Sequence, residues 1–148
     1  MNVVVLAAGK GKRMHSSLPK VLQALAGRPL LDHVLDATAG LADHPRVVVI
    51  GHAADIVRKH YEGRTDIVFA FQQEQLGTGH ALMQALAAIN PEDPLTLVCL
   101  GDVPLLSQKT LMAMAEAGAD GSLVLLTVEL SDPTGYGRIV RNASGAVA

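Results

Sequence analysis

Short apolar runs rich in β-branched residues alternate with longer segments whose apolar residues recur every three or four positions. The runs lie at residues 3–6, 47–50, 67–71, 95–100 and 123–128, and each is typical of a strand buried on both faces. The helix-like segments lie near residues 30–35, 56–61, 82–89 and 107–115. Alternating strands and helices require right-handed crossovers, so the sequence predicts an α/β fold: a Rossmann-like, mostly parallel sheet with helices on both faces. A ligand of such a sheet is expected at the carboxyl ends of its strands.

Length and composition fit one domain spanning residues 1–148, without an internal repeat or linker. No apolar stretch approaches the ~20 residues of a membrane span. Met1 leads directly into the first apolar run without the basic segment of a secretory signal, so we expect a cytoplasmic protein. The single cysteine, Cys99, excludes an internal disulfide framework and a cysteine-based zinc site, and we interpret it as a core residue.

The net charge of −2 is too small to predict binding to nucleic acid or to a membrane, and we expect neither partner. The charge is nevertheless unevenly distributed. Residues 1–31 contain five basic and no acidic residues, whereas the rest of the chain holds all 14 acidic and the other seven basic residues. An uncompensated basic segment favours an anionic ligand. Its basic residues are Lys10, Lys12, Arg13, Lys20 and Arg28.

The loop after the first run reads Leu-Ala-Ala-Gly-Lys-Gly-Lys-Arg-Met at residues 6–14. Gly9 and Gly11 allow tight turns, and the small side chains let a ligand approach the backbone. Lys10, Arg13 and the later Lys20 can neutralise phosphate oxygens, so we interpret the loop as a polyphosphate cradle. It lacks the glycine spacing of a P-loop and of a dinucleotide fingerprint. The alternative is a glycine turn with solvated lysines.

A carboxylate is expected at the same edge of the sheet, because Asp102 follows the run at residues 95–100. A single carboxylate suits Mg²⁺, which binds few protein oxygens and completes its shell with water and substrate phosphate. The alternative role of Asp102 is to cap a loop or the start of a helix.

The last residues of the sequence have the pattern of a hairpin. Residues 136–141 are predicted to form a strand, residues 142–145 a turn, and residues 146–148 the beginning of a return strand. Because a domain seldom ends within a hairpin, we expect the sequence to be part of a longer chain. The alternative is a frayed tail.

Four further motifs accompany the loop at residues 6–14. They are Leu-Pro-Lys-Val-Leu at 18–22, Gln-Gln-Glu-Gln-Leu-Gly-Thr-Gly-His-Ala at 72–81, Gly-Asp-Val-Pro-Leu at 101–105 and Asp-Pro-Thr-Gly-Tyr-Gly-Arg-Ile at 132–139. In order and spacing, the five motifs resemble the uridylyltransferase half of the bacterial bifunctional N-acetylglucosamine-1-phosphate uridyltransferases/glucosamine-1-phosphate acetyltransferases, the GlmU family. The first motif fits any sugar-nucleotide pyrophosphorylase, whereas those at 72–81 and 132–139 are more specific. The resemblance covers nearly the whole chain and implies a GT-A-like nucleotidyltransferase fold.

The resemblance also implies residue roles. Arg13, Lys20 and Lys10 would act as electrostatic catalysts on the triphosphate, Asp102 would bind Mg²⁺, and Gly137 would lie near the sugar. His80 is expected to cap or pack rather than to catalyse. Gln72 would read uracil, whose edge matches the donor and acceptor of an amide; alternatively it is a surface strand residue. The residues implied to hold UTP are Leu6, Ala7, Ala8, Gly9, Lys20, Gln72, Gly77 and Thr78.

The implied reaction converts UTP and N-acetylglucosamine 1-phosphate to UDP-N-acetylglucosamine and pyrophosphate, a step of peptidoglycan and lipopolysaccharide synthesis, with Mg²⁺ as cofactor. The acceptor phosphate is already anionic, so alignment and charge neutralisation suffice without a general base. Within the same class, the alternative is another sugar or alditol phosphate nucleotidyltransferase. Outside it, the alternative is a non-catalytic nucleotide-binding module.

Two residues depart from the family pattern. Leu100 stands where a tyrosine is usual, which puts a sugar-side contact in doubt, and Lys12 stands where threonine is frequent. The family's remaining acceptor-side and metal-binding residues, and its β-helix acetyltransferase domain, would lie beyond Ala148. We therefore expect this chain to bind nucleotide but to be poorly active alone. The family forms trimers through that absent domain, which leaves homo-oligomer formation by this chain an open expectation.

Overall fold

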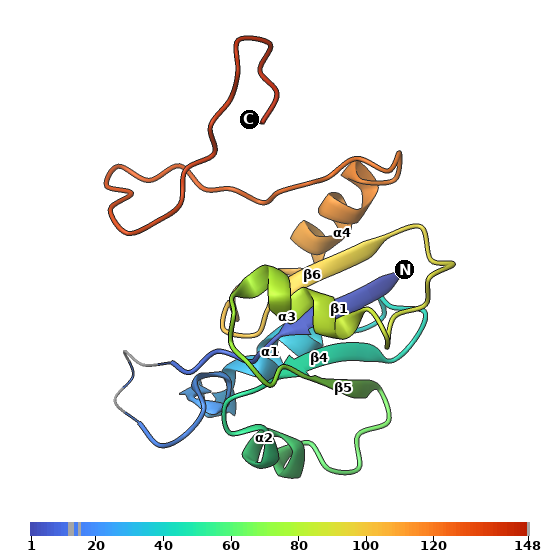
Figure 1. Ribbon diagram of the computed structural model, residues 1–148, viewed down its shortest axis with the longest axis vertical. Helices are drawn as coiled ribbons and strands as arrows, with labels where there is room; N and C mark the ends of the chain where they lie inside the picture. Colours follow the sequence, from blue (N-terminus) through green and yellow to red (C-terminus); the bar gives the residue numbers. More distant parts are fainter. Residues whose placement is uncertain (12–13, 15, 148) are drawn as a thin grey trace.

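The computed structural model describes residues 1–11, 14 and 16–147. Its centre is a four-stranded sheet in the order β5-β4-β1-β6, in which every neighbouring pair is parallel (Figure 1). Four of the five predicted runs therefore form strands, and the predicted α/β fold with a parallel sheet is confirmed. The strands are β1 (Asn2–Leu6), β4 (Arg46–Ile50), β5 (Ile67–Phe71) and β6 (Thr96–Leu100).

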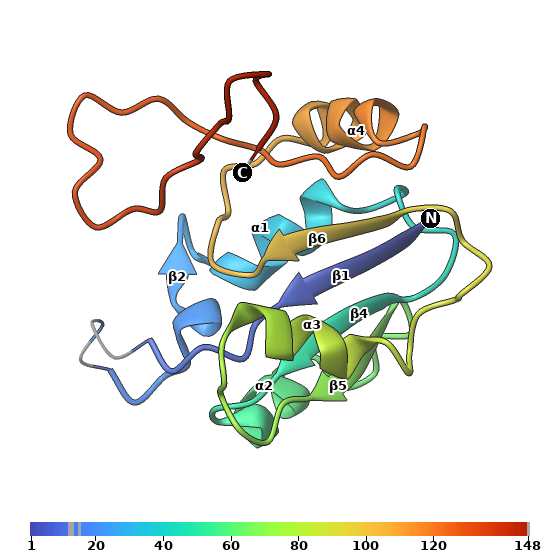
Figure 2. The same cartoon turned by 45° about the horizontal axis from the view of Figure 1, so that its top comes forward.

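Helices cover both faces of the sheet, as predicted (Figure 2). Successive side chains of a strand point to opposite faces, so Val3 and Val5 of β1 join one apolar core while Val4 and Leu6 join the other. The first core is completed by α1, α2 and α4, and the second by α3. The helices are α1 (Leu30–Ala37), α2 (Ala54–His60), α3 (Thr78–Ala85) and α4 (Gln108–Ala117).

The edge strands differ from the prediction of burial on both faces. Every residue of β1 and β4 is buried, whereas β6 is buried at alternate residues and β5 only in part. The reason is the position of α3, which packs over β1, β4 and β5 and leaves one face of β6 open. Val98 and Leu100 of β6 are consequently 39% and 45% exposed.

The predicted strand at residues 123–128 is wrong. After α4 the chain leads away from the sheet (Figures 1 and 2), and Leu123 is 87% exposed. A strand forms only where a neighbour pairs with its backbone groups, and no such ladder to residues 123–128 exists within the described residues.

The strand predicted for residues 136–141 is also absent: the backbone turns at Pro133 to Tyr136, and among the described residues only Arg141 of this stretch pairs with another segment. The turn at residues 142–145 is confirmed: the N–H of Gly145 donates to the carbonyl of Asn142 at 2.9 Å. The return segment is limited to one antiparallel bridge between Arg141 and Val147, and Ala148 lies outside the described residues.

The connection from β1 to α1 contains a short 3-10 helix, η2 (Lys20–Leu22), and a small antiparallel hairpin of β2 (Ala24–Leu25) and β3 (Arg28–Pro29). Val21 and Leu22 are buried in the first core. This anchoring holds the neighbouring Lys20 at the carboxyl end of the sheet.

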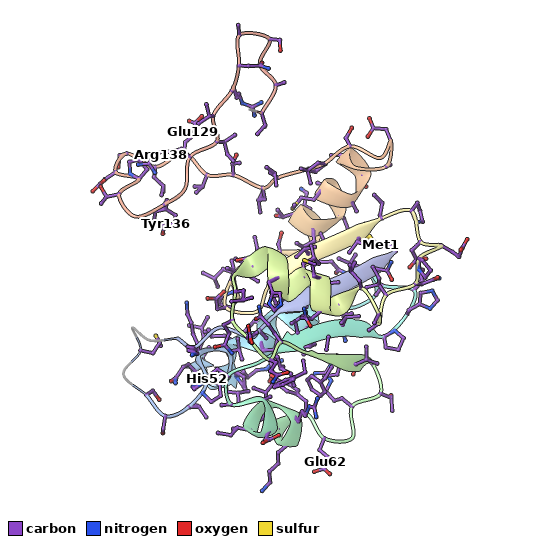
Figure 3. All side chains as sticks on the ribbon, viewed as in Figure 1. Met1, His52, Glu62, Glu129, Tyr136 and Arg138 are labelled. Carbon is purple, nitrogen blue, oxygen red and sulfur yellow. The ribbon has the colours of Figure 1, made fainter. Side chains whose placement is uncertain are left out.

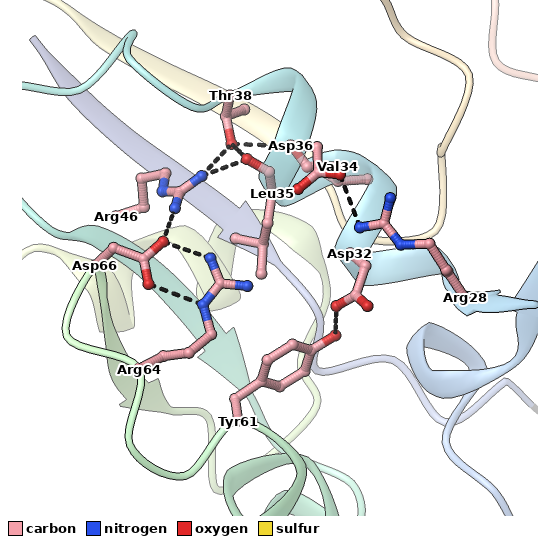
Figure 4. Close-up of polar contacts among 10 residues, drawn as sticks. All are labelled: Arg28, Asp32, Val34, Leu35, Asp36, Thr38, Arg46, Tyr61, Arg64 and Asp66. Atoms are coloured by element: carbon pink, nitrogen blue, oxygen red, sulfur yellow. Dashed lines mark hydrogen bonds and ion pairs between the residues drawn. The ribbon is translucent and has the colours of Figure 1, made fainter.

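A polar cluster fastens α1 to β4 and to the segment before β5 (Figure 4). The guanidinium of Arg46, a residue only 6% exposed, donates to the backbone carbonyl of Leu35 and to Thr38 Oγ1, the latter at 3.3 Å. It also pairs with Asp66, which accepts a second hydrogen bond from Arg64 Nε at 2.8 Å. A buried arginine is tolerated where its donors are satisfied in this way.

Cys99 is buried in the core, as predicted, and burial raises the pKa of its thiol to about 11. The thiol is therefore protonated and unreactive at neutral pH. Within the part of the chain that the structure describes, no helix combines the length and apolar character required to cross a membrane.

Candidate functional site

The carboxyl ends of the strands lie side by side. Leu6 of β1 is opposite Leu100 of β6, and Ile50 of β4 is opposite Phe71 of β5. The loops that leave three of these ends carry the sequence motifs at residues 6–14, 72–81 and 101–105. The parallel sheet therefore brings together segments nearly one hundred residues apart, at the edge where such sheets bind ligands.

These loops enclose a cavity of ≈360 Å³. Its wall contains every residue predicted to hold UTP and the predicted metal ligand. The full wall consists of Leu6, Ala7, Ala8, Gly9, Lys20, Val21, Gln72, Gln75, Gly77, Thr78, Ala81, Leu100 and Asp102.

Small residues let the loops behind this wall pack closely. A Cβ at Gly101 would lie 3.2 Å from the carbonyl oxygen of Leu6 and 3.3 Å from Ala7 Cβ. A Cβ at Gly51, in the loop after β4, would lie 2.9 Å from the carbonyl oxygen of Gln72. All three distances are shorter than ordinary Cβ contacts, so these glycines allow the loops to meet.

A lysine and an aspartate form an ion pair in the cavity wall. Lys20 Nζ donates to Asp102 Oδ2 at 2.6 Å, and the two side chains are 39% and 31% exposed. Behind the pair, a Cβ at Gly11 would lie 2.8 Å from Lys20 Cβ. The predicted phosphate contact and the predicted metal ligand thus neutralise each other in the free chain.

Gln72 is a buried polar residue, 2% exposed, and not the surface strand residue of the alternative interpretation. Its backbone N–H donates to the carbonyl of Ile50 at 2.8 Å. Its side-chain Nε2 lies 3.2 Å from the carbonyl oxygen of Gly77 and 3.0 Å from His80 Nδ1. Gly77 precedes α3 with a φ of 106°, a conformation that favours glycine. The turn therefore presents the Gly77 carbonyl to Gln72.

Two predicted residues lie elsewhere, and a third cannot be placed. Lys10 is exposed and is not part of the cavity wall. Gly137 is exposed between Tyr136 and Arg138, which Figure 3 places on the segment that projects from the sheet. Arg13 lies outside the described residues. Their proposed roles stay predictions.

The wall also contains residues that had no predicted role, of which Gln75 is the polar one. Gln75 lies three positions after Gln72 in the motif at residues 72–81. The sequence signal that could have identified Gln75 as a site residue was its membership of the same motif as Gln72. The motif does not specify which glutamines face inward, because that depends on how the loop folds back between β5 and α3.

The donor chemistry at Asp102 fits a weakly coordinated magnesium ion. No group of three or more His, Cys, Asp or Glu residues capable of holding a metal exists among the described residues, which argues against a closed protein site. Mg²⁺ commonly uses one or two carboxylates together with water and substrate phosphates. Asp102 already binds a cationic group, Lys20 Nζ, on one oxygen.

A second, larger cavity of ≈490 Å³ lies between β6, α4 and residues 122–126. Its wall is almost entirely aliphatic, and it contains none of the predicted site residues. Cavity size alone would favour it, but convergent polar groups mark the smaller cavity as the functional candidate.

Two solved structures resemble this chain. A nucleotidyl transferase from Methanothermobacter thermautotroptrophicus is 28% identical, with a TM-score of 0.68 over 78% of this chain and 56% of that one. The Rv0371C protein of Mycobacterium tuberculosis H37Rv, in complex with manganese, is 25% identical, with a TM-score of 0.66 over 80% of this chain and 59% of that one.

Sequence similarity confirms the resemblance inferred from the motifs. The chain is 55% identical over 147 residues to the "Bifunctional protein GlmU" of Cupriavidus metallidurans; the match covers 99% of this chain and 32% of that protein. The chain thus spans about a third of the length of this curated relative. The family profile of the MobA-like NTP transferase domain matches residues 3–142. The chain therefore belongs to the MobA-like NTP transferase family.

Proposed function

We propose that this chain binds UTP and contributes to uridylyl transfer onto N-acetylglucosamine 1-phosphate, giving UDP-N-acetylglucosamine and pyrophosphate. The observation that carries the proposal is the cavity in which the buried amide of Gln72 and the Lys20–Asp102 pair share one wall. The amide of Gln72 suits the base of a nucleotide, and the cation of Lys20 suits its phosphates. The 55% identity to a GlmU protein supports this choice of substrates.

Gln72 would recognise the uracil ring. The wall beside it is small, because Gly77, Thr78 and Ala81 leave room for a planar ring against the start of α3. An amide placed there matches the donor and acceptor of the uracil edge. Selection among nucleotides would then depend on hydrogen bonds made at the buried amide of Gln72.

Lys20 and Asp102 would exchange partners when substrate binds. Lys20 would turn from the carboxylate to phosphate oxygens, and the released Asp102 would accept a divalent cation as a ligand. A bound Mg²⁺ would supply positive charge to the phosphates of UTP. Because the pair is 2.6 Å apart and partly exposed, the exchange needs little rearrangement of the chain.

In this mechanism the protein aligns the two substrates and neutralises the negative charge of their phosphates. The acceptor phosphate oxygen attacks the α-phosphorus, the bond to the bridging oxygen breaks, and pyrophosphate leaves with the electron pair. No protein base has to remove a proton. Lys20, together with the predicted contacts of Lys10 and Arg13, would offset the charge that develops on the leaving group.

The proposal is tested by calorimetric titration of the chain with UTP, CTP, ATP and GTP, with and without Mg²⁺. We expect the tightest binding for UTP with Mg²⁺. Equal affinities would contradict uracil recognition. A parallel measurement of pyrophosphate release with N-acetylglucosamine 1-phosphate separates catalysis from binding: selective UTP binding without release would indicate a nucleotide-binding module.

A further inference from the structure

The orientation of the Gln72 amide is fixed by the groups around it. Its nitrogen lies 3.2 Å from the Gly77 carbonyl oxygen, which can only accept a hydrogen bond. The same nitrogen lies 3.0 Å from His80 Nδ1. One of its hydrogens points to each partner, so both donors are used within the protein. The atom left for the cavity is therefore Gln72 Oε1, an acceptor.

This arrangement also specifies the tautomer of His80. Nδ1 can accept from Gln72 only when it carries no hydrogen, so the neutral ring carries its hydrogen on Nε2. The side-chain amide of Gln84, one helical turn later, lies 3.3 Å from His80 Nε2. The same Gln84 nitrogen lies 3.4 Å from the backbone carbonyl oxygen of His80, to which it donates. Gln84 therefore lies on the Nε2 side of the ring and Gln72 on the Nδ1 side, and the tautomer follows from the contact with Gln72.

We propose that His80 is a positioning residue that determines base selectivity by holding Gln72 Oε1 toward the cavity. The inference rests on the proposed function, since it concerns the base that Gln72 reads. Uracil carries a hydrogen on N3 and can donate to Oε1, whereas cytosine has an unprotonated acceptor at N3. If the amide rotated, Nε2 would face the base and cytosine would become the better partner. Held by His80 in this orientation, Gln72 selects uridine over cytidine nucleotides.

The tautomer is tested without any ligand. Two-bond ¹H–¹⁵N correlation spectra of the imidazole rings distinguish the two neutral tautomers and the charged ring. We expect His80 to show a hydrogen on Nε2 and an unprotonated Nδ1. A hydrogen on Nδ1 would overturn the inference, because Gln72 Nε2 would then face a second donor.

Selectivity is tested by the ratio of the affinities for UTP and CTP. The contribution of the triphosphate is the same for both nucleotides and cancels in this ratio. His80→Leu removes the acceptor at similar volume, and we expect the ratio to fall by at least about tenfold, the scale of one buried hydrogen bond. His80→Asn places an amide oxygen where Nδ1 was, and we expect it to keep the ratio within about threefold. His60→Leu, on an exposed face of α2, is the matched control and should leave the ratio unchanged.

The outcomes are distinguishable. If the unaltered chain shows no preference for UTP over CTP, base recognition in the proposed function fails. If it prefers UTP and His80→Leu keeps that preference, the positioning role of His80 alone is overturned. Should His80→Leu not fold, His80→Ala replaces it, because it also removes the acceptor for Gln72 Nε2 and should lower the ratio in the same direction. The tautomer of the unaltered chain decides independently: a hydrogen on Nδ1 overturns the role of His80 whatever the ratio.

Discussion

At the residue scale, the Lys20–Asp102 pair holds two opposite charges that substrate and metal would otherwise contact. Replacing Lys20 by methionine should therefore act in opposite directions on two ligands. The affinity for Mn²⁺ alone should rise by up to about fivefold, since Asp102 loses a partner worth no more than a partly exposed ion pair. The affinity for UTP should fall by about tenfold or more, because a charged contact to phosphate is lost.

Electron paramagnetic resonance measures the affinity for Mn²⁺, and calorimetry measures the affinity for UTP. Lys59→Met on α2 is the control, and parallel changes in both affinities would refute the exchange of partners.

Gln72 is the second residue whose change has a defined direction. Gln72→Ala should reduce the preference for UTP over the other nucleotides by roughly 1–3 kcal/mol, because it removes a buried side-chain amide from the cavity wall. Binding of the triphosphate itself should persist through Lys20. Gln73→Ala, at the exposed neighbouring position, is the matched control. Titration with the four nucleotides checks the result, and an unchanged preference would remove Gln72 from base recognition.

At the element scale, α3 begins at a turn that only glycine adopts easily. Gly77→Ala should lower the free energy of unfolding by about 1–3 kcal/mol, the usual cost of a strained backbone, and should weaken UTP binding because the Gly77 carbonyl orients Gln72. Gly79 lies inside the same helix with nothing within 4 Å of an added Cβ. Gly79→Ala should therefore stabilise the chain by about 0.5–1 kcal/mol. Urea denaturation of both variants tests this pair, and equal effects would contradict the role of the turn.

The elements also show what the sequence can predict. β1 and β4 were predictable because their apolar residues are continuous, as expected for central strands. The site loops were predictable because parallel strands place their carboxyl ends together. The strand prediction at residues 123–128 was wrong for a physical reason. β-Propensity indicates that side chains suit the surface of a sheet, but strand pairing also needs a partner strand from elsewhere in the chain. Likewise, no local pattern tells that α3 leaves one face of β6 uncovered or that Gln75 faces the cavity.

At the scale of the whole molecule, two of the five basic residues of the early segment are paired with carboxylates. Lys20 pairs with Asp102, and Arg28 pairs with Asp36 of α1, so part of the charge imbalance along the sequence becomes ion pairs in the fold. The Arg28–Asp36 pair is exposed on both sides and contributes little to stability. For an anionic ligand the important pair is that of Lys20, because it lies in the cavity wall, where phosphate can replace the carboxylate.

The other charge cluster, at the amino ends of β4 and β5 and so at the opposite edge of the sheet from the site loops, sets how stability depends on pH. The hydrogen bond from Arg64, together with the charges of Arg64 and Arg46, lowers the pKa of Asp66 to about 2. A carboxyl whose pKa is lower in the folded than in the unfolded chain stabilises the fold above its unfolded pKa of about 3.9. That stability is lost as the pH falls from about 4 toward 2. Asp66 is partly exposed, so solvent reduces the effect below the value that the full shift would give.

Asp66→Asn should therefore flatten the acid-induced decrease in stability between about pH 4 and pH 2. At neutral pH it should lower the free energy of unfolding by about 1–3 kcal/mol, because it removes the carboxylate partner of the buried Arg46 (Figure 4). Asp36→Asn removes an exposed carboxylate of the same charge from α1 and should change stability by less than about 0.5 kcal/mol at neutral pH. Urea denaturation at a series of pH values measures both variants. If Asp66→Asn kept the acid slope of the unaltered chain, the cluster around Arg46 would fasten α1 to β4 through its backbone and hydroxyl contacts alone.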